Sequence, residues 1–423
     1  MARFIALDDW LAWQEQFHPR PIDLGLERVA GVLTRLECQS EKIPTITVAG
    51  TNGKGSCVAF LEAIYHAQGY KVGAYTSPHI LRYNERIRID GVPVSNEEIC
   101  AAFERIDAVR ADTSLSYFEF GTLAALDIFS RAAVEVRILE VGLGGRLDAV
   151  NIIDADVALV TTIAIDHVDW LGHTEEAIGR EKAGIFRQGS PAVVGDYQVP
   201  MSLLNVADEK QARVLQIGQS FDYRKHAQNW AWMSNQLKLT ELPLPGLQGE
   251  HQFRNASAAI MAVTCLQSLL PVSQASIGQG LVGVNLPGRF QLIAGDPPVL
   301  LDVGHNPQAV ETLLNHLQVH FAQVRIHAVF AMMKDKDIPG VLSLMKQRVA
   351  KWYLAPLKNP RAANVDLLSG YFQQQDIKNV NHGYLDFAEA FNAARSQAKP
   401  GELILIFGSF FLVSEYLSQF ASR

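Results

Sequence analysis

The stretch at residues 47–56 (TVAGTNGKGS) holds the residues best suited to bind a phosphate group. A short β-branched run leads into a glycine-rich turn, and an amphipathic helix pattern begins near Ser56. Glycines let backbone N–H groups turn toward phosphate oxygens, a helix N-terminus adds partial positive charge, and Lys54 adds a full charge. The pattern therefore predicts a cradle for a nucleotide triphosphate.

The segment departs from the common phosphate-loop pattern at two positions. Val48 stands where the first glycine would be, and Gly55 separates Lys54 from Ser56. The alternative is a glycine-rich hairpin or a helix cap, which would leave Lys54 as an unexplained cation. A strand, a turn, a lysine and a helix in this order favour the phosphate site.

Four further segments carry side chains that could do chemistry. Three of them follow predicted strands, and the fourth is a predicted helix. Because parallel-sheet enzymes place their sites at the carboxyl ends of strands, we expect the first three to lie near one another. In chain order the segments are TSPH at 76–79, GLGGRLD at 142–148, DHVDW at 166–170 and REKAGIF at 180–186.

A hydroxyl and an imidazole in these segments, together with a carboxylate in the strand before the second segment, could hold a metal ion beside the phosphates. They belong to Ser77, Glu140 and His167. Magnesium prefers hard oxygen ligands, which the first two supply. Ser77 could instead cap a turn, and His167 could be a satisfied core histidine. Glu140 lies in an apolar strand, where a buried carboxylate needs a cation or hydrogen-bond donors.

The glycines at 142–145 also suggest a dinucleotide-binding loop. The sixth position of that fingerprint is Leu147 rather than glycine or alanine, and no helix pattern clearly starts there. We therefore reject a nicotinamide site.

Composition narrows the class of protein. A chain of 423 residues exceeds one typical core, so two domains are expected. The net charge of -7 argues against a nucleic-acid-coating surface. The four cysteines are scattered without a C-x-x-C, which argues against a disulfide framework or zinc site and fits a reducing compartment. They are Cys38, Cys57, Cys100 and Cys265.

Neither end of the chain predicts membrane association. Residues 7–17 suit an amphipathic surface helix rather than a signal peptide. The most apolar run, at 403–413, is too short to span a bilayer and is broken by Gly408 and Ser409. We expect a cytoplasmic monomer with small-molecule substrates and no nucleic-acid or membrane partner.

Apolar β-rich runs alternate with helical patterns, which predicts an α/β fold with a largely parallel sheet. The polar stretch at 211–244 suggests a small antiparallel insertion, and residues 295–298 (GDPP) suggest a linker. We therefore expect domains at 1–294 and 298–423. Strands are predicted at 45–49, 71–75, 86–90, 136–141, 157–163 and 192–195, then at 299–303, 326–331, 352–354 and 403–407.

Taken together, these segments resemble one family, the folylpolyglutamate synthases of the Mur ligase superfamily. The resemblance runs from residue 22 to residue 410 and leaves out 211–244. SLSYFEFGT at 114–122 is similar to the bifunctional branch, which is also a dihydrofolate synthase. The longest shared motifs are TVAGTNGKGS, TSPHILRYNERIRI, LEVGLGGRLDAVN, IDHVDWLG and GREKAGIF.

The resemblance implies a fold and a reaction. The fold is a P-loop-type ATPase domain with a mostly parallel sheet, like the central domain of Mur ligases, followed by a smaller Rossmann-like α/β domain. In the reaction a substrate carboxylate attacks the γ-phosphate of ATP, and the amine of L-glutamate displaces phosphate from the acyl phosphate. The first substrate is 7,8-dihydropteroate, and later rounds extend reduced folates.

The resemblance also implies roles for individual residues. The expected catalytic residues are Lys54, Lys182 and His167, and the metal ligands are Ser77, Glu140, His167 and a carbamate formed from Lys182 and CO2. The ATP-binding residues are Thr51, Asn52, Gly53, Lys54, Gly55, Ser56, Asn255, Arg289 and Asp302. The substrate-binding residues are Asp23, Ser116, Tyr117, Phe118, Glu119, Leu147, Asp148, Ala149 and His305. Two Mg²⁺ sites are expected, and a monovalent cation is a further candidate.

Several of these residues have structural alternatives. Lys182 must lose a proton before it reacts with CO2, so its pKa should be depressed, but it could simply pair with Glu181 on a helix surface. Asn255 could cap a helix. Arg289 and Asp302 could form a hinge ion pair or a strand-end cap. Tyr117 and Phe118 could be core residues.

Three other functions stay open at this point. The chain could be a monofunctional folylpolyglutamate synthase or another Mur-type ligase that acts on a cell-wall nucleotide peptide. It could also be a nucleotide-dependent switch, although nothing resembles switch loops and the motif around Lys182 would then have no use. Phosphate release that depends on glutamate separates a ligase from a switch.

Overall fold

The computed structural model describes residues 3–20, 22–37 and 42–420. Cys38 therefore lies outside the described residues. The chain forms two compact units, which we describe separately. The first contains residues 1–163, 170–246 and 253–284, and the second contains residues 164–169, 247–252 and 285–423.

The first unit is built on an eight-stranded sheet in the order β4-β3-β2-β5-β1-β6-β7-β8. All pairs from β2 to β8 are parallel, and only β3 and β4 at one edge are antiparallel. The predicted α/β fold with a mostly parallel sheet is confirmed. The strands are β1 (Thr45–Ala49), β2 (Val72–Tyr75), β3 (Ile87–Ile89), β4 (Val92–Pro93), β5 (Val136–Glu140), β6 (Val157–Val160), β7 (Pro191–Val194) and β8 (Arg213–Gln216).

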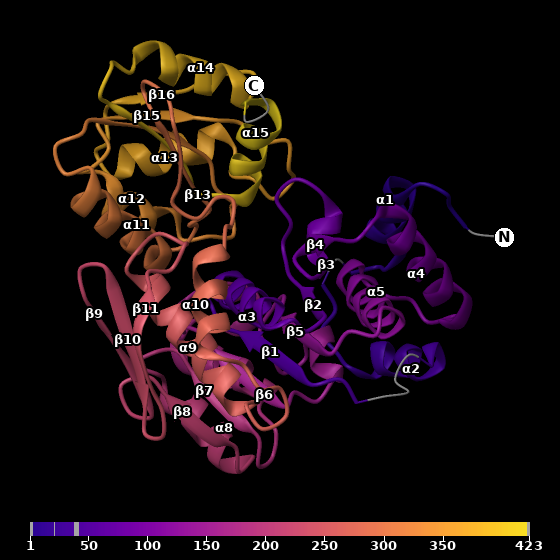
Figure 1. The fold of residues 1–423 in the computed structure, drawn as a ribbon. Coiled ribbons are helices and arrows are strands. Elements are labelled where there is room, and N and C mark those ends of the chain that lie inside the picture. Colours follow the sequence, from indigo (N-terminus) through magenta and orange to yellow (C-terminus); the bar gives the residue numbers. More distant parts are fainter. Residues whose placement is uncertain (1–2, 21, 38–41, 421–423) are drawn as a thin grey trace. The chain divides into compact units, whose positions relative to one another are not determined.

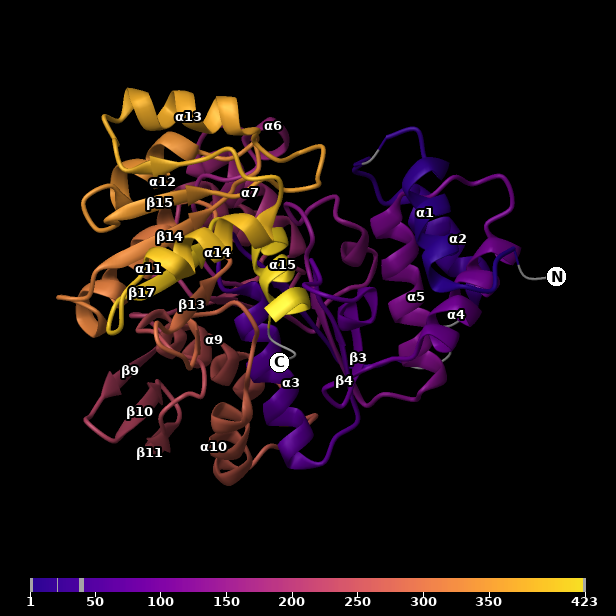
Figure 2. The same ribbon diagram turned by 90° about the horizontal axis from the view of Figure 1, so that it is seen from above.

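Helices α1, α2, α4 and α5 pack together beside this sheet (Figures 1 and 2). They share a hydrophobic core with strand side chains such as Tyr75, Leu139 and Val160. The helices wholly in this unit are α1 (Leu7–Phe17), α2 (Glu27–Leu36), α3 (Lys54–Gln68), α4 (Asn96–Val109), α5 (Tyr117–Arg131), α7 (Glu175–Lys182), α8 (Met201–Glu209) and α10 (Gln274–Gly283). Two more, α6 (Val168–Leu171) and α9 (His251–Cys265), begin in residues of the second unit and end in this one. Short 3-10 helices are η1 (Tyr83–Arg86), η2 (Ala149–Ile152) and η3 (Ala183–Ile185).

Helix α3 begins at Lys54, directly after Gly53 as its N-cap, rather than near Ser56. It was expected to be amphipathic, but its residues are buried on nearly every side from Ser56 to Tyr65. The reason is tertiary, because α10 lies alongside α3 and covers it (Figure 2). The close approach needs Gly280, since a Cβ there would lie 2.6 Å from backbone atoms of Ile64.

The segment at 211–244 was predicted as one antiparallel insertion, and this is only partly right. Its first strand, β8, extends the main parallel sheet. The rest forms a separate three-stranded antiparallel sheet, visible beside α9 and α10 in Figure 1. Its strands are β9 (Phe221–Lys225), β10 (Asn229–Ser234) and β11 (Lys238–Pro243).

The second unit contains a six-stranded sheet in the order β12-β13-β17-β14-β15-β16. Only β12 is antiparallel. The strands are β12 (Gln291–Ile293), β13 (Val299–Asp302), β14 (Ile326–Phe330), β15 (Lys351–Leu354), β16 (Val380–Asn381) and β17 (Leu403–Phe407). The helices are α11 (Pro307–His320), α12 (Ile338–Met345), α13 (Val365–Gln374), α14 (Phe387–Gln397) and α15 (Phe410–Phe420).

The expected linker at 295–298 is instead the turn of the hairpin that joins β12 to β13. The second unit consequently begins before this segment, at Asn285. It also takes in residues 164–169, which follow β6, and residues 247–252, where α9 begins. Among the described residues, no helix is long and apolar enough to cross a membrane.

Replacing Gly280 with alanine should push α10 away from α3. Because the added Cβ meets backbone rather than a flexible side chain, we expect a loss of about 2 kcal/mol in unfolding free energy. Gly283→Ala on the same helix is the matched control, since nothing lies within 4 Å of a Cβ there. Chemical denaturation of both variants would test this, and equal stabilities would contradict the close-packing explanation.

Candidate active site

The phosphate loop follows β1 and is held against the end of β6. Thr51 N–H donates to the Thr162 carbonyl at 2.7 Å, and Thr161 Oγ1 donates to the Asn52 carbonyl at 2.7 Å. Gly50 has a φ of 143°, and a Cβ there would lie 1.8 Å from Thr161 Oγ1. Only glycine therefore allows the loop this close to β6.

These contacts divide the loop into two parts. The N–H groups of Thr51 and Asn52 bond to Thr162, so they are engaged within the protein. The N–H groups of Lys54, Gly55 and Ser56 belong to the first turn of α3 and by position have no acceptor within the helix. The first turn of α3 is therefore the part of the loop that suits an anion.

Two lysines converge on one carbonyl of this loop. Lys54 Nζ donates to the Gly50 carbonyl at 3.0 Å and to that of Thr51 at 3.3 Å. Lys182 Nζ, from the end of α7, donates to the same Gly50 carbonyl at 2.9 Å and is buried. Two ammonium groups sharing one acceptor create a positive site at the first turn of α3, which favours a polyanion.

Asn255 also lies at this loop. Its side chain is buried, and its Oδ1 would be 2.6 Å from a Cβ placed on Gly53, whose φ is 91°. Asn255 was expected to bind ATP, and its side chain lies beside the glycine-rich turn at Gly53. It lies in the first half of α9, not at a helix cap.

Two of the three expected metal ligands lie together. Glu140 ends β5 and is buried, and its Oε2 accepts the Ser77 N–H at 3.2 Å. A serine hydroxyl and a carboxylate are hard oxygen donors, so this pair fits Mg²⁺. His167 belongs to the second unit. No cluster of three His, Cys, Asp or Glu side chains suited to a metal occurs among the described residues, so the predicted set stays a prediction.

The expected pterin residues Ser116 and Glu119 have structural tasks at the start of α5. They form a capping box, in which Glu119 Oε2 accepts the Ser116 N–H at 2.7 Å. The other oxygen of Glu119 accepts from Arg28 at 3.0 Å, and Arg28 also pairs with Asp23 at 3.1 Å. Arg28, which the sequence analysis did not single out, therefore links Asp23 to the α5 terminus.

Tyr117 and Phe118 are half-buried and pack against the hydrophobic core of the first unit. Phe118 packs against Gly142, where a Cβ would lie 2.6 Å from its ring. Tyr117 packs edge-on against Tyr83 at 5.7 Å between ring centroids, and Arg86 lies over both rings. These rings could offer a flat surface to a heterocycle.

Asp148 is buried at the start of η2, between half-buried Leu147 and buried Ala149. It accepts backbone N–H groups from Leu143 at 2.8 Å and Val150 at 3.1 Å. Burial raises the pKa of the Asp148 carboxyl to about 6, although these N–H groups and Lys54 oppose the shift. No α-helix starts after the glycines at 142–145, which agrees with rejecting a dinucleotide loop.

In the second unit, Asp302 supports the backbone around the end of β13. It accepts N–H groups from Gly304 at 2.8 Å and Phe290 at 3.3 Å. Burial raises its pKa to about 6, against the lowering effect of Arg289. Arg289 lies over the Phe410 ring at 5.2 Å. Both residues therefore lie near the end of β13, and Asp302 caps backbone N–H groups there, as the alternative of a strand-end cap predicted.

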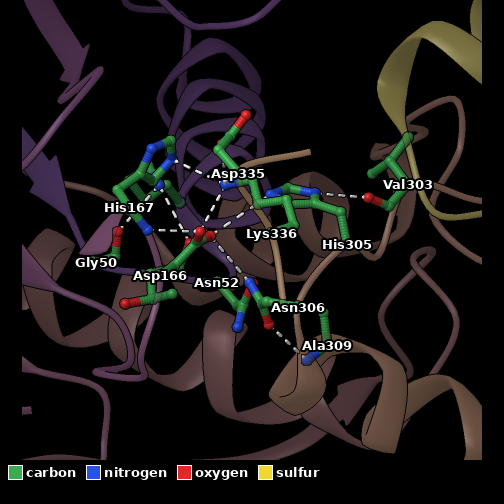
Figure 3. A network of polar contacts seen from close by, with 12 residues as sticks. Gly50, Asn52, Asp166, His167, Val303, His305, Asn306, Ala309, Asp335 and Lys336 are labelled. Atoms are coloured by element: carbon green, nitrogen blue, oxygen red, sulfur yellow. Dashed lines mark hydrogen bonds and ion pairs between the residues drawn. The ribbon is translucent and has the colours of Figure 1, made fainter. Parts of the chain in front are cut away.

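Asp166 is the centre of a polar network in the second unit (Figure 3). Its Oδ1 accepts from Lys336 Nζ at 2.5 Å and from the His167 N–H at 2.7 Å. Its Oδ2 accepts from Asn306 Nδ2 at 3.2 Å and lies 3.6 Å from His305 Nε2. Burial would raise the pKa of Asp166, but the contacts with His305 and Lys336 hold it well below its usual range.

Lys336 was missed in the sequence analysis. Its signal was the charged run Asp335-Lys336-Asp337 soon after the strand predicted at 326–331. The carboxyl end of a parallel strand is where such residues would be expected to act.

Fold and site together define a nucleotide-binding α/β protein of the P-loop type. The Mur ligase middle domain matches residues 48–263, and the Mur ligase glutamate ligase domain matches residues 288–410. A dihydrofolate synthase/folylpolyglutamate synthase of Escherichia coli is 43% identical over 419 residues, which cover 99% of this chain and 96% of the relative.

Solved structures agree with this match. E. coli FolC in complex with DHPP and ADP has a TM-score of 0.93 at 43% identity and covers 99% of this chain and 98% of its own. A bifunctional folylpolyglutamate synthase/dihydrofolate synthase with Mn, AMPPNP and L-glutamate bound has a TM-score of 0.90 at 43% identity, covering 98% of each chain. The chain belongs to the dihydrofolate synthase/folylpolyglutamate synthase family of Mur ligases.

The raised pKa of Asp148 predicts a pH dependence of stability. The unfolded chain loses this proton near pH 4 and the folded chain near pH 6, so the contribution to unfolding free energy falls as pH rises between these values. Between the two limits, the contribution of Asp148 to the unfolding free energy changes by about 3 kcal/mol. Denaturation at pH 4 to 7 should show a smaller fall in Asp148→Asn than in the wild type. Parallel curves would contradict the assignment.

Proposed function

We propose that this chain is an ATP-dependent amide ligase that adds L-glutamate to 7,8-dihydropteroate and to reduced folates. The observation that carries the proposal is the pair Lys54 and Lys182 on the Gly50 carbonyl, beside the first turn of α3. The family and its structures with nucleotide and glutamate bound support the same activity.

The main physical obstacle to the reaction is that two anions must meet. A folate carboxylate and ATP repel each other, and Lys54 with the N–H groups of the α3 first turn would neutralise the phosphates. The carboxylate then attacks the γ-phosphate, ADP leaves, and the glutamate amine displaces phosphate to form the amide. Exclusion of water protects the acyl phosphate from hydrolysis.

Ser77, Glu140 and His167 would hold Mg²⁺, which supplies charge neutralisation at the transferring phosphoryl group. Lys182 as a carbamate would provide oxygens for a second metal. The Gly50 geometry supports this modification, because two ammonium groups on one acceptor repel each other and a carbamate would replace that repulsion by attraction to Lys54. In the modified enzyme, Lys54, the first turn of α3 and the bound metal would supply the positive charge for the phosphates, and Lys182 would no longer contribute to it. A monovalent cation is a further candidate.

We assign the other predicted site residues to ATP binding or to substrate binding, according to the place of each in its unit. Asn255, Arg289 and Asp302 would contribute to ATP binding, and His305 to binding of the amino-acid substrate. Tyr117, Phe118 and Asp148 would receive the pterin. The first and second units, with the bounds given above, would act as the ATP-binding and glutamate ligase domains of a cytoplasmic monomer.

An assay of ADP release with and without glutamate tests the function. We expect release with dihydropteroate and with tetrahydrofolate, only when glutamate is present, and none with a cell-wall nucleotide peptide. Activity with tetrahydrofolate alone would restrict the enzyme to polyglutamylation. ADP release at the same rate with and without glutamate would refute the proposed ligase activity. Lys54→Ala is the control and should lose on the order of a hundredfold or more in turnover while keeping its circular dichroism spectrum.

Lys182→Ala tests the carbamate. The variant should be severely impaired, because both the metal-binding oxygens and the side chain at Gly50 are lost. Added short carboxylic acids should partly restore activity by supplying oxygens in the vacated space. Mass spectrometry of native protein under CO2 should find a labile carbamate on Lys182. An active variant, or an unmodified lysine in a nucleotide-bound crystal structure, would contradict the proposal.

A further inference from the structure

The network around Asp166 joins three separate stretches of chain within the second unit (Figure 3). These are residues 166–167, the pair His305 and Asn306 at the start of α11, and Lys336 after β14. Two of the residues joined, His167 and His305, have proposed roles in metal and substrate binding. Asp166 and Lys336 have none.

Asp166 controls the backbone as well as the side chains of this network. His167 has a φ of 51°, a conformation that costs energy for a residue with a Cβ. The bond from the His167 N–H to Asp166 Oδ1 at 2.7 Å compensates for that cost. Asn306 is the N-cap of α11 through its Oδ1, so only its Nδ2 is left to reach Asp166.

Lys336 completes the arrangement at His167. Its side chain is only 5% exposed, and its Nζ lies 3.3 Å from His167 Nε2 while it bonds Asp166 Oδ1 at 2.5 Å. An ammonium group can only donate, so His167 Nε2 is the acceptor in this contact. Through this contact Lys336 fixes the orientation of the His167 ring, while Asp166 fixes its backbone.

We propose that Asp166 and Lys336 form a buried ion pair that positions His167 and His305 for metal and substrate binding, with Asn306 anchoring the start of α11 to Asp166. The pair touches no reacting atom and acts through these three residues. The inference rests on the proposed function for the roles of His167 and His305. The positioning itself rests on the distances above.

Asp166→Asn, Lys336→Met and the double variant separate positioning from stability. Each single variant leaves an uncompensated or half-bonded partner and should lower the melting temperature. The double variant removes both charges and should recover most of that loss. We expect Mn²⁺·AMPPNP affinity, followed by electron paramagnetic resonance, and kcat/KM for glutamate to stay lower by on the order of tenfold or more in all three.

Glu402→Gln is the matched control. Glu402 directly precedes β17 and lies at the amino ends of the strands in the same unit. Its carboxylate accepts a hydrogen bond from His327 Nε2 at 2.9 Å. This variant should lower the melting temperature without changing Mn²⁺·AMPPNP affinity or kcat/KM.

If the double variant regains wild-type binding and kcat/KM together with its stability, the pair is only structural and the proposal is overturned. Unchanged binding in Asp166→Asn, which keeps the size and one acceptor oxygen, would also overturn it. A wild-type protein that releases no ADP with glutamate would refute the proposed function instead. The Mn²⁺·AMPPNP comparison would then still decide on the positioning.

Discussion

The attachment of the phosphate loop to the end of β6 is the constraint on which the first unit's site depends. Thr161 and Thr162 hold the loop so closely that position 50 admits no Cβ. Its carbonyl is thereby available to two lysines, and the N–H groups in the first turn of α3 by position have no acceptor within the helix, which suits an anion. A looser loop would lose the convergence of positive charge.

Buried carboxylates in this protein have two different structural roles. At the start of α5 and at η2, buried carboxylates satisfy backbone N–H groups and so fix the entry of these segments. Asp166 also accepts a backbone N–H, but most of its partners are side chains from distant segments. Buried carboxylates of the first kind define local structure, whereas one of the second kind joins segments that are distant in the chain.

The sequence alone determined those features that depend on local patterns. The alternation of apolar runs and helical patterns predicted every strand of the main sheet from β1 to β7 except the short β4, often within a residue or two of its bounds. The glycine-rich turn and Lys54 predicted the phosphate loop, because each part of that motif acts within a few residues of the next. The family motifs then identified the chemistry.

Only the tertiary structure determined the features that depend on contacts between residues far apart in the chain. Helix α3 is buried all round because α10 covers it, and residues 295–298 turn a hairpin because β12 pairs with β13. Lys182 shares an acceptor with Lys54, and Lys336 bonds Asp166, across more than a hundred residues in each case. No local pattern encodes such contacts, since periodicity and spacing report only on residues that are close in the chain.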